Sequence, residues 1–277
     1  MFSILIPTFN NLNYLKLCLH SIKKNSKYEH EIIIHINEGT DGTFDYVKNS
    51  GIKYTFSSKN EGVCVAFNKS AKISSKEYIV LGHDDMYFCP NWDIHFVNEL
   101  KKINHKNFFL SGTMVQYYNG PINIDCGKNP ETFNEKKLLN ELSLINFEDF
   151  QGTHWQPSLI AKSTWDSVNG FSEEFSPGLG SDPDFNMKLW KKGIRIFKGL
   201  GKCRVYHFSS ISLRKKVWNN GAKIFLLKWG ISIKFFKKYY LRSNEVYTDK
   251  LYDPKKNFIY YIDLVKCKLK LIYHKIS

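Results

Sequence analysis

An apolar run that ends in two adjacent carboxylates is the sequence feature that most limits which fold this chain can adopt. Residues 78–81 are apolar, Gly82 bounds them, and Asp84 and Asp85 follow. Such a run is typical of a buried strand, and open α/β sheets bind ligands at the carboxyl ends of their strands. Two neighbouring carboxylates repel each other unless a divalent cation joins them, so the pattern predicts a Mg²⁺ or Mn²⁺ site. A helix N-cap ahead of Pro90 is the alternative.

Three more strand-like runs come earlier in the chain, each followed by a polar loop. They cover residues 2–6, 31–36 and 52–56, and a helical pattern over residues 12–22 follows the first. Strands that alternate with helices predict right-handed crossovers and a largely parallel sheet. The sequence contains neither a G-x-G-x-x-G after the first strand nor a G-x-x-x-x-G-K-[ST], which disfavours dinucleotide enzymes and P-loop NTPases.

A second acidic segment opens a predicted helix later in the chain. Asp182 is a residue type that favours the N-cap position, Pro183 favours the first helical turn, and Gly193 favours the C-terminal end of the helix. One interpretation is that Asp182 only caps this helix. The other is that the glycine-rich loop ahead of it brings a further carboxylate toward Asp84 and Asp85.

Three ring side chains near predicted strands admit a structural and a functional interpretation. His154 and Trp155 precede an apolar strand at residues 158–161, where they suit either core packing or contact with a ligand. Short strands are predicted at residues 195–198 and 203–208, and the second carries His207. A lone histidine on a strand is either structural or a ligand to a metal.

The positive charge of the chain is concentrated near its C-terminus. The formal net charge is +14, and residues 211–277 hold 16 Lys and Arg against 4 Asp and Glu, a share of +12. This favours a solvated lysine-rich surface or an anionic membrane surface; nucleic acid binding is disfavoured because no recognition motif accompanies the charge. Six scattered cysteines without C-x-x-C spacing predict reduced, buried thiols. We expect no spanning helix and no signal peptide, and hence a cytoplasmic protein.

Six short motifs in order resemble a family-2 glycosyltransferase of the GT-A fold over residues 2–210. They are Pro7-Thr8-Phe9-Asn10, Glu38 to Thr43, Asn60 and Gly62 with Ala66 and Asn68, His83-Asp84-Asp85, Gly180 to Phe185, and Tyr206-His207. Phe67 stands where the family commonly has arginine, His83 where it has aspartate, and Ser181 where it has glutamate. The Q-x-x-R-W motif of processive synthases is absent, which implies single additions.

The resemblance implies a Rossmann-like, nucleotide-binding, mostly parallel sheet flanked by helices over residues 1–210, with a basic helical extension over residues 211–277. It implies inverting transfer of a sugar from a nucleoside-diphosphate-sugar, with a UDP-sugar as the first expectation. Mn²⁺ or Mg²⁺ assists, and the acceptor is a glycan or lipid-linked hydroxyl in surface polysaccharide biosynthesis. A catalytically degenerate binding relative and a sugar nucleotidyltransferase are the alternatives.

The same resemblance assigns roles to individual residues. Asp182 is the expected base and Asp184 the second choice, Asp85 and His207 are expected metal ligands, and His154 and Trp155 face the acceptor. The expected nucleotide-binding residues are Pro7, Thr8, Asn10, Glu38, Asn60, Gly62, Asn68 and Asp84.

The last segment has a helical pattern with two possible partners. Ile259, Ile262, Val265, Leu269 and Ile272 recur at helical spacing, and lysines alternate with them. Such a helix either lies on an anionic bilayer, as peripheral attachment to the inner membrane face, or docks on the domain with a solvated lysine face.

Overall fold

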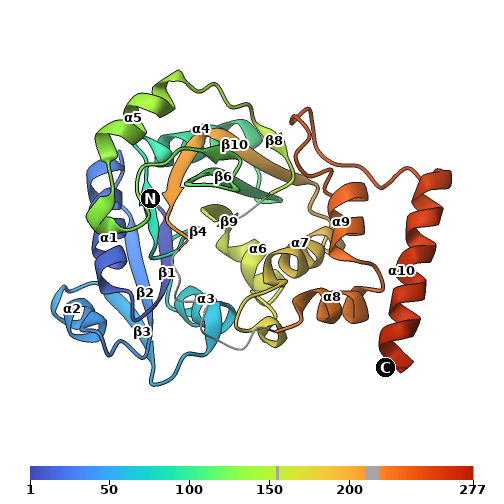
Figure 1. The fold of residues 1–277 in the computed structure, drawn as a ribbon, viewed down its shortest axis with the longest axis horizontal. Helices are drawn as coiled ribbons and strands as arrows, with labels where there is room; N and C mark the ends of the chain where they lie inside the picture. The colour runs from blue at the N-terminus through green and yellow to red at the C-terminus, as the bar shows by residue number, and fades with distance from the viewer. Residues whose placement is uncertain (154–155, 210–218, 277) are drawn as a thin grey trace.

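The computed structural model describes residues 1–153, 156–209 and 219–276 (Figure 1). Within them one sheet has the strand order β3-β2-β1-β4-β9-β6-β10-β5, with β7 beside β6 and β8 beside β10. The strands are β1 (Ser3–Phe9), β2 (Glu31–Asn37), β3 (Lys53–Ser57), β4 (Tyr78–Leu81), β5 (Met86–Phe88), β6 (Phe108–Gln116), β7 (Ile122–Asn123), β8 (Phe150–Gln151), β9 (Ser158–Ala161) and β10 (Ile196–His207).

Helices cover both faces of this sheet. They are α1 (Leu12–Asn25), α2 (Thr43–Asn49), α3 (Gly62–Lys72), α4 (Trp92–Ile103), α5 (Glu135–Leu144), α6 (Lys162–Ser167), α7 (Ser181–Lys191), α8 (Gly221–Trp229), α9 (Ile233–Tyr239) and α10 (Phe258–Ile276), with short 3-10 turns at Pro130–Thr132 and Glu173–Phe175. Leu5 of β1 packs with α3 and α7 on one face. Ile4 and Ile6 pack with α1 and α4 on the other, because successive side chains of a strand alternate.

The predicted α/β fold is confirmed, with three local differences. β1 pairs in parallel with β2 and β4, whereas β9 and β5 enter the later half antiparallel. β1 continues through Phe9, beyond its predicted end at residue 6. β10 is one strand with a register shift between Gly199 and Arg204, where two short strands were predicted. All six cysteines are buried and free of disulfides, as predicted.

The boundary expected at residue 210 does not separate two hydrophobic cores. Phe225 of α8 and Phe236 of α9 are fully buried in the same cluster as Phe185 of α7. The chain beyond α9 also returns to the sheet, since the backbone N–H of Leu251 donates to the carbonyl of Arg195. The segment of residues 219–257 therefore shares the hydrophobic core that contains α7.

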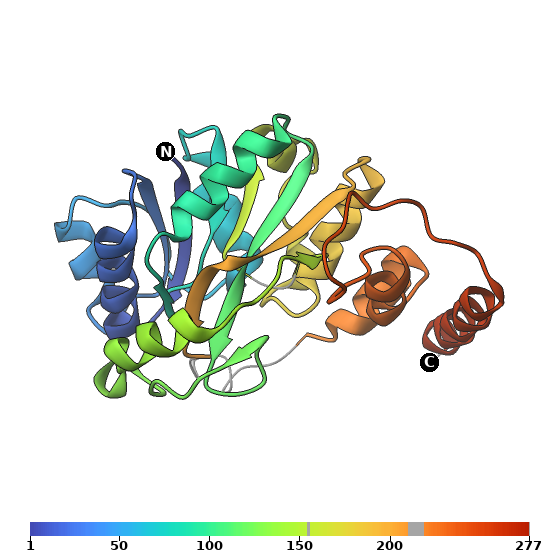
Figure 2. The ribbon, with the colours of Figure 1, turned by 90° about the horizontal axis from the view of Figure 1, so that it is seen from above.

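Helix α10 lies at one end of the molecule, after an extended connection (Figure 2). Tyr260 and Cys267 are its buried residues, and they face the rest of the protein. The predicted apolar stripe faces outward: Ile259, Ile262, Val265, Leu269 and Ile272 are 39% to 62% exposed. Helix α10 thus docks on α8 and α9, as one of the two interpretations expects, but its apolar stripe is exposed together with its lysines. Among the described residues, no helix is long and apolar enough to cross a bilayer.

Candidate active site

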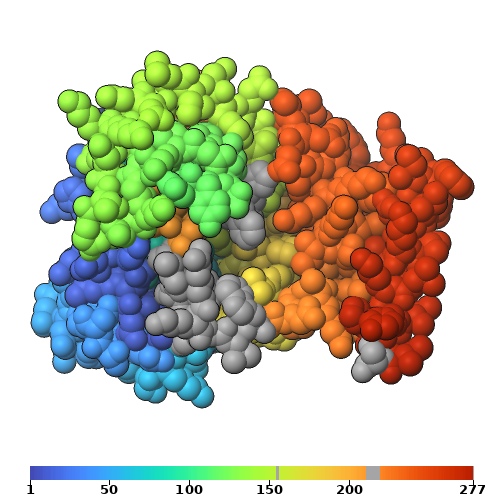
Figure 3. Space-filling view, in the orientation of Figure 1, coloured from blue at the N-terminus to red at the C-terminus, as the bar shows by residue number. Residues whose placement is uncertain are grey.

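A cleft of about 420 Å³ lies where the carboxyl ends of β1, β2 and β4 meet the start of α7. The predicted site residues that line this cleft are Pro7, Thr8, Asn60, Gly62, Asp84, Asp85, Asp182 and His207. Residues from both halves of the sequence thus meet at one edge of the sheet, as expected for an α/β fold. In Figure 3 the N-terminal part of the chain, in blue, and the described residues from about 220 onward, in orange and red, lie on opposite sides of the middle of the molecule.

The two carboxylates that follow β4 are both buried, and one of them contacts His207. Strand β5 begins directly after them, and Asn91 occupies the N-cap of α4, so the helix-cap interpretation of Asp84 and Asp85 is wrong. The Nε2 atom of His207 lies 3.2 Å from an Asp85 carboxylate oxygen. Burial opposes the charged ring, but the nearby Asp85 carboxylate outweighs it and raises the pKa of His207. Burial and the neighbouring Asp85 raise the pKa of Asp84 to about 7.

Two departures from the family pattern lie against each other. The ring of His83 meets Phe67 edge to face, with the ring centroids 5.9 Å apart. A family with arginine and aspartate at these positions would place opposite charges here, whereas this chain places two rings. Burial lowers the pKa of His83, so the pair is neutral and mutually compatible.

Gln156 connects His83 to Asp182 across the cleft. Its Nε2 atom donates to Oδ1 of Asp182 at 3.0 Å, and its Oε1 atom lies 3.2 Å from Nε2 of His83. Asp182 is not the helix cap: α7 begins at Ser181, and Gly180 takes the N-cap position with a φ of 86°. The Asp182 carboxylate is therefore available to the cleft. Burial raises its pKa to about 6, against the opposing effect of the Gln156 hydrogen bond.

A close backbone contact holds the loop before α7 over the cleft. Gly62 has a φ of 83°, and a Cβ atom there would lie 2.7 Å from Cα of Pro177. The next amide, that of Val63, donates to the Pro177 carbonyl at 3.1 Å. The Asn60 side chain accepts from the Gly62 amide at 2.8 Å, which fixes this turn. Only glycine fits both the dihedral angle and the space.

Three of the expected nucleotide-binding residues do not line the cleft. Asn10 and Glu38 contact each other, and Asn10 also accepts from the Thr40 amide at 2.8 Å, so they shape the loop after β2. The Asn68 amide bonds both backbone groups of Phe171 and thereby fixes the segment before α7. These side chains are used in loop structure, which the motif alone did not distinguish from ligand binding.

Asp184, the second choice as base, lies away from the cleft. It is fully buried, and its Oδ1 atom accepts from the Trp229 indole at 2.8 Å and lies 3.0 Å from Nζ of Lys228. Its two-residue offset from Asp182 turns it toward α8, because each helical residue rotates by about 100°. His154 and Trp155, expected to face the acceptor, lie outside the described residues.

The motifs missed several residues that the structure brings to the site. Gln156 lies outside every matched motif, and only its position just after His154 and Trp155 hinted at a role. Asn37 ends β2 one residue before Glu38, lines the cleft, and accepts from the Glu61 amide at 3.0 Å. Asn11 is the N-cap residue of α1, and the Asp41 carboxylate accepts from the Leu12 amide at 2.9 Å in the first turn of that helix.

The charge of the cleft suits a cation better than a bare diphosphate. Among its described lining residues there are three carboxylates, two histidines and no lysine or arginine. The described residues contain no group of three or more His, Cys, Asp or Glu that could cage a metal by itself. Asp85 and His207 therefore fit a Mg²⁺- or Mn²⁺-type ion whose remaining ligands are water and substrate phosphate, since such ions commonly use few protein ligands.

Comparison with known proteins agrees with this architecture. Residues 3–152 match glycosyl transferase family 2, more than half of the chain. The chain belongs to this family. An uncharacterized glycosyltransferase of Rickettsia bellii is 33% identical over 115 residues, which cover 40% of this chain and 16% of the relative. The hyaluronan synthase of Pasteurella multocida is 24% identical over 227 residues, covering 77% of this chain and 21% of the synthase. The chain thus spans a small part of these relatives.

Solved glycosyltransferase structures share the GT-A fold with this protein. TarS of S. aureus superposes with a TM-score of 0.55 at 16% identity, over 76% of this chain and 37% of TarS. GalNAc-T7, whose crystal structure holds UDP, GalNAc and Mn²⁺, gives a TM-score of 0.59 at 17% identity, over 86% of this chain and 49% of its own. The predicted family and fold are confirmed.

Proposed function

We propose that this protein transfers a sugar from a nucleoside-diphosphate-sugar to a hydroxyl of a glycan or lipid-linked acceptor, with inversion. One observation carries the proposal: Asp182 and His207 line the same cleft as Asp84 and Asp85, although about a hundred residues of chain separate Asp182 from the Asp84–Asp85 pair. A base and a site for a cation that binds the leaving diphosphate, both on one cleft, are what this inverting displacement requires.

The strand-end residues bind the donor in this proposal. Pro7, Thr8, Asn60 and Gly62 contact the nucleoside, and Asp84 contacts its ribose. A UDP-sugar is the first candidate, because TarS has been crystallised with UDP and GalNAc-T7 with UDP and Mn²⁺. Asp85 and His207 would hold a Mn²⁺ or Mg²⁺ ion, which when bound offsets the negative charge of the leaving diphosphate.

Asp182 accepts the proton of the acceptor hydroxyl. Gln156 holds its Oδ1 atom, which orients the carboxylate at the start of α7. Oδ2 has no protein hydrogen-bond partner in the described part of the chain, so it is the oxygen that meets the acceptor. The hydroxyl then attacks the anomeric carbon from the side opposite the leaving group, which inverts its configuration.

Thermal stabilisation against a panel of nucleoside diphosphates and their sugars, each with and without Mn²⁺, tests the donor half of this proposal. We expect one nucleotide to raise the Tm, and to do so only with the metal. If no nucleotide shifts the Tm in either condition, the protein is a degenerate relative and the assignment fails. A transfer assay and a pyrophosphate-exchange assay with the stabilising donor then separate the two enzyme classes. A glycosyltransferase moves the sugar to an acceptor, whereas only a nucleotidyltransferase exchanges pyrophosphate.

The outward stripe of α10 supports a second proposal, that the protein attaches peripherally to an anionic membrane. Lys266, Lys268 and Lys270 lie on the same helix as the stripe, and apolar side chains flanked by lysines suit the interface of an anionic bilayer. Attachment would bring the cleft near a lipid-linked acceptor of a surface glycan. Cytoplasmic location at the inner face of the membrane is part of this proposal.

Flotation with vesicles that contain one third phosphatidylglycerol tests the attachment. We expect wild-type protein to float, and a variant with Ile262, Val265 and Leu269 each changed to Gln to stay in the pellet fraction. The control is Leu144→Gln, because Leu144 is 85% exposed on α5, far from α10 in sequence. Equal flotation of the triple variant and the control would overturn the proposal.

A further inference from the structure

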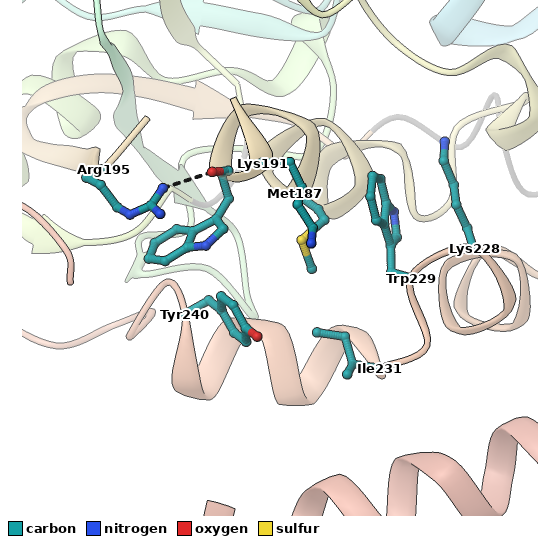
Figure 4. A pocket seen from close by; sticks show the side chains of 8 residues that line it. Met187, Lys191, Arg195, Lys228, Trp229, Ile231 and Tyr240 are labelled. Atoms are coloured by element: carbon teal, nitrogen blue, oxygen red, sulfur yellow. Dashed lines mark hydrogen bonds between the residues drawn. The ribbon is translucent and has the colours of Figure 1, made fainter. Parts of the chain in front are cut away.

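A second cavity, of about 470 Å³, lies between α7, α8 and α9 (Figure 4). Lys191, which lines it, follows Asp182 by nine residues, or two and a half helical turns, so the two side chains point to opposite sides of α7. This cavity is therefore separate from the cleft. Its volume falls within the range of about 300–1,000 Å³ that is typical of small-ligand sites.

The lining of the cavity combines apolar walls with positive charge. Met187, Trp190, Trp229, Ile231 and Tyr240 form the walls. The cations are Lys191, Arg195 and Lys228, and the described lining has no acidic residue. In Figure 4, Arg195 and Lys228 stand at opposite ends of the cavity, with Trp229, Ile231 and Tyr240 between them.

These groups are held in place by contacts with one another and with neighbouring residues. The Arg195 guanidinium lies 3.9 Å from the ring centre of Trp190 and donates to the Trp190 carbonyl at 2.8 Å. Because Arg195 covers one face of Trp190 and Phe197 packs near the ring with an interplanar angle of 26°, this indole is a wall and not a platform for a nucleobase. Lys228 lies 2.8 Å from Glu174 and 3.0 Å from Asp184, and Arg195 lies 3.2 Å from Asp253, so both of these cations are paired. Lys191 has no ion-pair partner among the described residues.

We infer that this cavity binds an anionic saccharide, a sugar chain that carries carboxylate or phosphate groups. Aromatic and aliphatic walls suit the C–H faces of sugar rings, and the unpaired Lys191 beside them suits an anionic group on the sugar. A chain bound here is held on the far side of α7 from the reacting hydroxyl, as a growing acceptor would be. The inference uses the carbohydrate chemistry of the family but does not need Asp182 to be the base.

Isothermal titration of the full chain with three probes tests the inference. The probes are a galacturonic acid tetrasaccharide, maltotetraose as a neutral chain of equal length, and glucose 1-phosphate. We expect the acidic tetrasaccharide to bind at least tenfold more tightly than maltotetraose. Tighter binding of glucose 1-phosphate than of the tetrasaccharide would assign the cavity to a small sugar phosphate instead of a chain. Binding of none of the probes, or equal binding of the acidic and neutral chains, overturns the inference.

A matched pair of variants distinguishes the cavity from the general basic surface. Lys191→Glu and Lys192→Glu change the net charge equally at adjacent exposed positions, but only Lys191 lines the cavity. We expect Lys191→Glu to weaken binding of the acidic tetrasaccharide at least tenfold and Lys192→Glu to weaken it less than twofold, with unchanged Tm for both. Equal weakening by the two variants would show that only the surface charge attracts the ligand. The same titration on Asp182→Asn protein keeps the result independent of the proposed catalysis.

Discussion

The two cavities beside α7 have opposite charge and are built in different ways. The cleft takes Ser181 and Asp182 from the first turn of the helix, and the basic cavity takes Trp190 and Lys191 from its last turn. Acidic groups near a helix N-terminus and basic groups near its C-terminus are both favoured by the helix dipole. One short helix can therefore serve an acidic site and a basic site without electrostatic conflict.

The two sites also differ in how firmly their groups are fixed. In the cleft, Gln156 ties Asp182 to His83, and His207 contacts Asp85. In the basic cavity, Arg195 and Lys228 are paired with carboxylates, but Lys191 is exposed and has no ion-pair partner among the described residues. Reaction needs fixed geometry, whereas retention of a charged chain needs only charge of the right sign near an apolar wall. Substitutions on the two sides of α7 should therefore have separable effects.

The largest expected effect comes from Asp182→Asn. Without a base the transfer rate should fall by about 10²–10⁴-fold. The fold should tolerate the change, because burial raises the pKa of Asp182 to about 6 and an ionised carboxylate there opposes folding at neutral pH. We therefore expect the Tm at pH 7.5 to be equal or higher. Initial rates and a melting curve on the same preparation check both; transfer at the wild-type rate would remove Asp182 from the mechanism.

A second large effect is expected for Asp85→Ala, measured as metal-dependent stabilisation by the donor nucleotide. At a ligand concentration of 100 Kd, binding contributes about 2.7 kcal/mol to stability. The variant should lose most of this gain, because a cation would keep only His207 as a contact from this pair. Asp166→Ala is the control, since its carboxylate pairs with Lys162 on the surface of α6. Undiminished stabilisation of Asp85→Ala would place the metal elsewhere.

Asp184→Asn, two positions along the same helix, should lower stability and leave transfer nearly unchanged, which is the opposite of the effect expected for Asp182→Asn. Its carboxylate is buried against Lys228 and Trp229, so neutralisation should lower the free energy of unfolding by about 1–3 kcal/mol. Transfer should change less than threefold, because Asp184 does not line the cleft. Urea unfolding and initial rates measure the two effects. A large loss of transfer with unchanged stability would reverse the assignment of the two aspartates.

The sequence predicted the elements of the cleft better than their contacts. Strand-end residues such as Thr8 and Asp85 line the cleft, because parallel strands bring their carboxyl ends to one edge. Asn68 and Asp184 are not among its lining residues, because a motif records residue types and not whether the side chain turns toward a ligand or a neighbouring segment. Gln156 belongs to no motif, since its partners His83 and Asp182 are distant in sequence.

The smallest expected effect is a shift in the pH dependence of transfer. Asp182 must be ionised to accept a proton, so kcat/KM should fall as the pH drops through about 6. The Gln156 hydrogen bond and the charge of Lys237 lower the pKa of Asp182 and so oppose the effect of burial. Gln156→Ala removes the first of these, and the acid limb should move to higher pH by about half a unit to one unit.

The pH profile of Gln156→Ala distinguishes positioning from a general loss of structure. A variant that only disturbs the fold lowers the rate at every pH and leaves the acid limb in place, whereas loss of the hydrogen bond moves the limb. Gln156→Glu should move it in the same direction, because a second carboxylate beside Asp182 also disfavours ionisation. A limb that stays at the wild-type pH in both variants would show that Gln156 does not act through Asp182. The basic cavity across α7 should bind its ligand unchanged in all of them, because Gln156 is not among its lining residues.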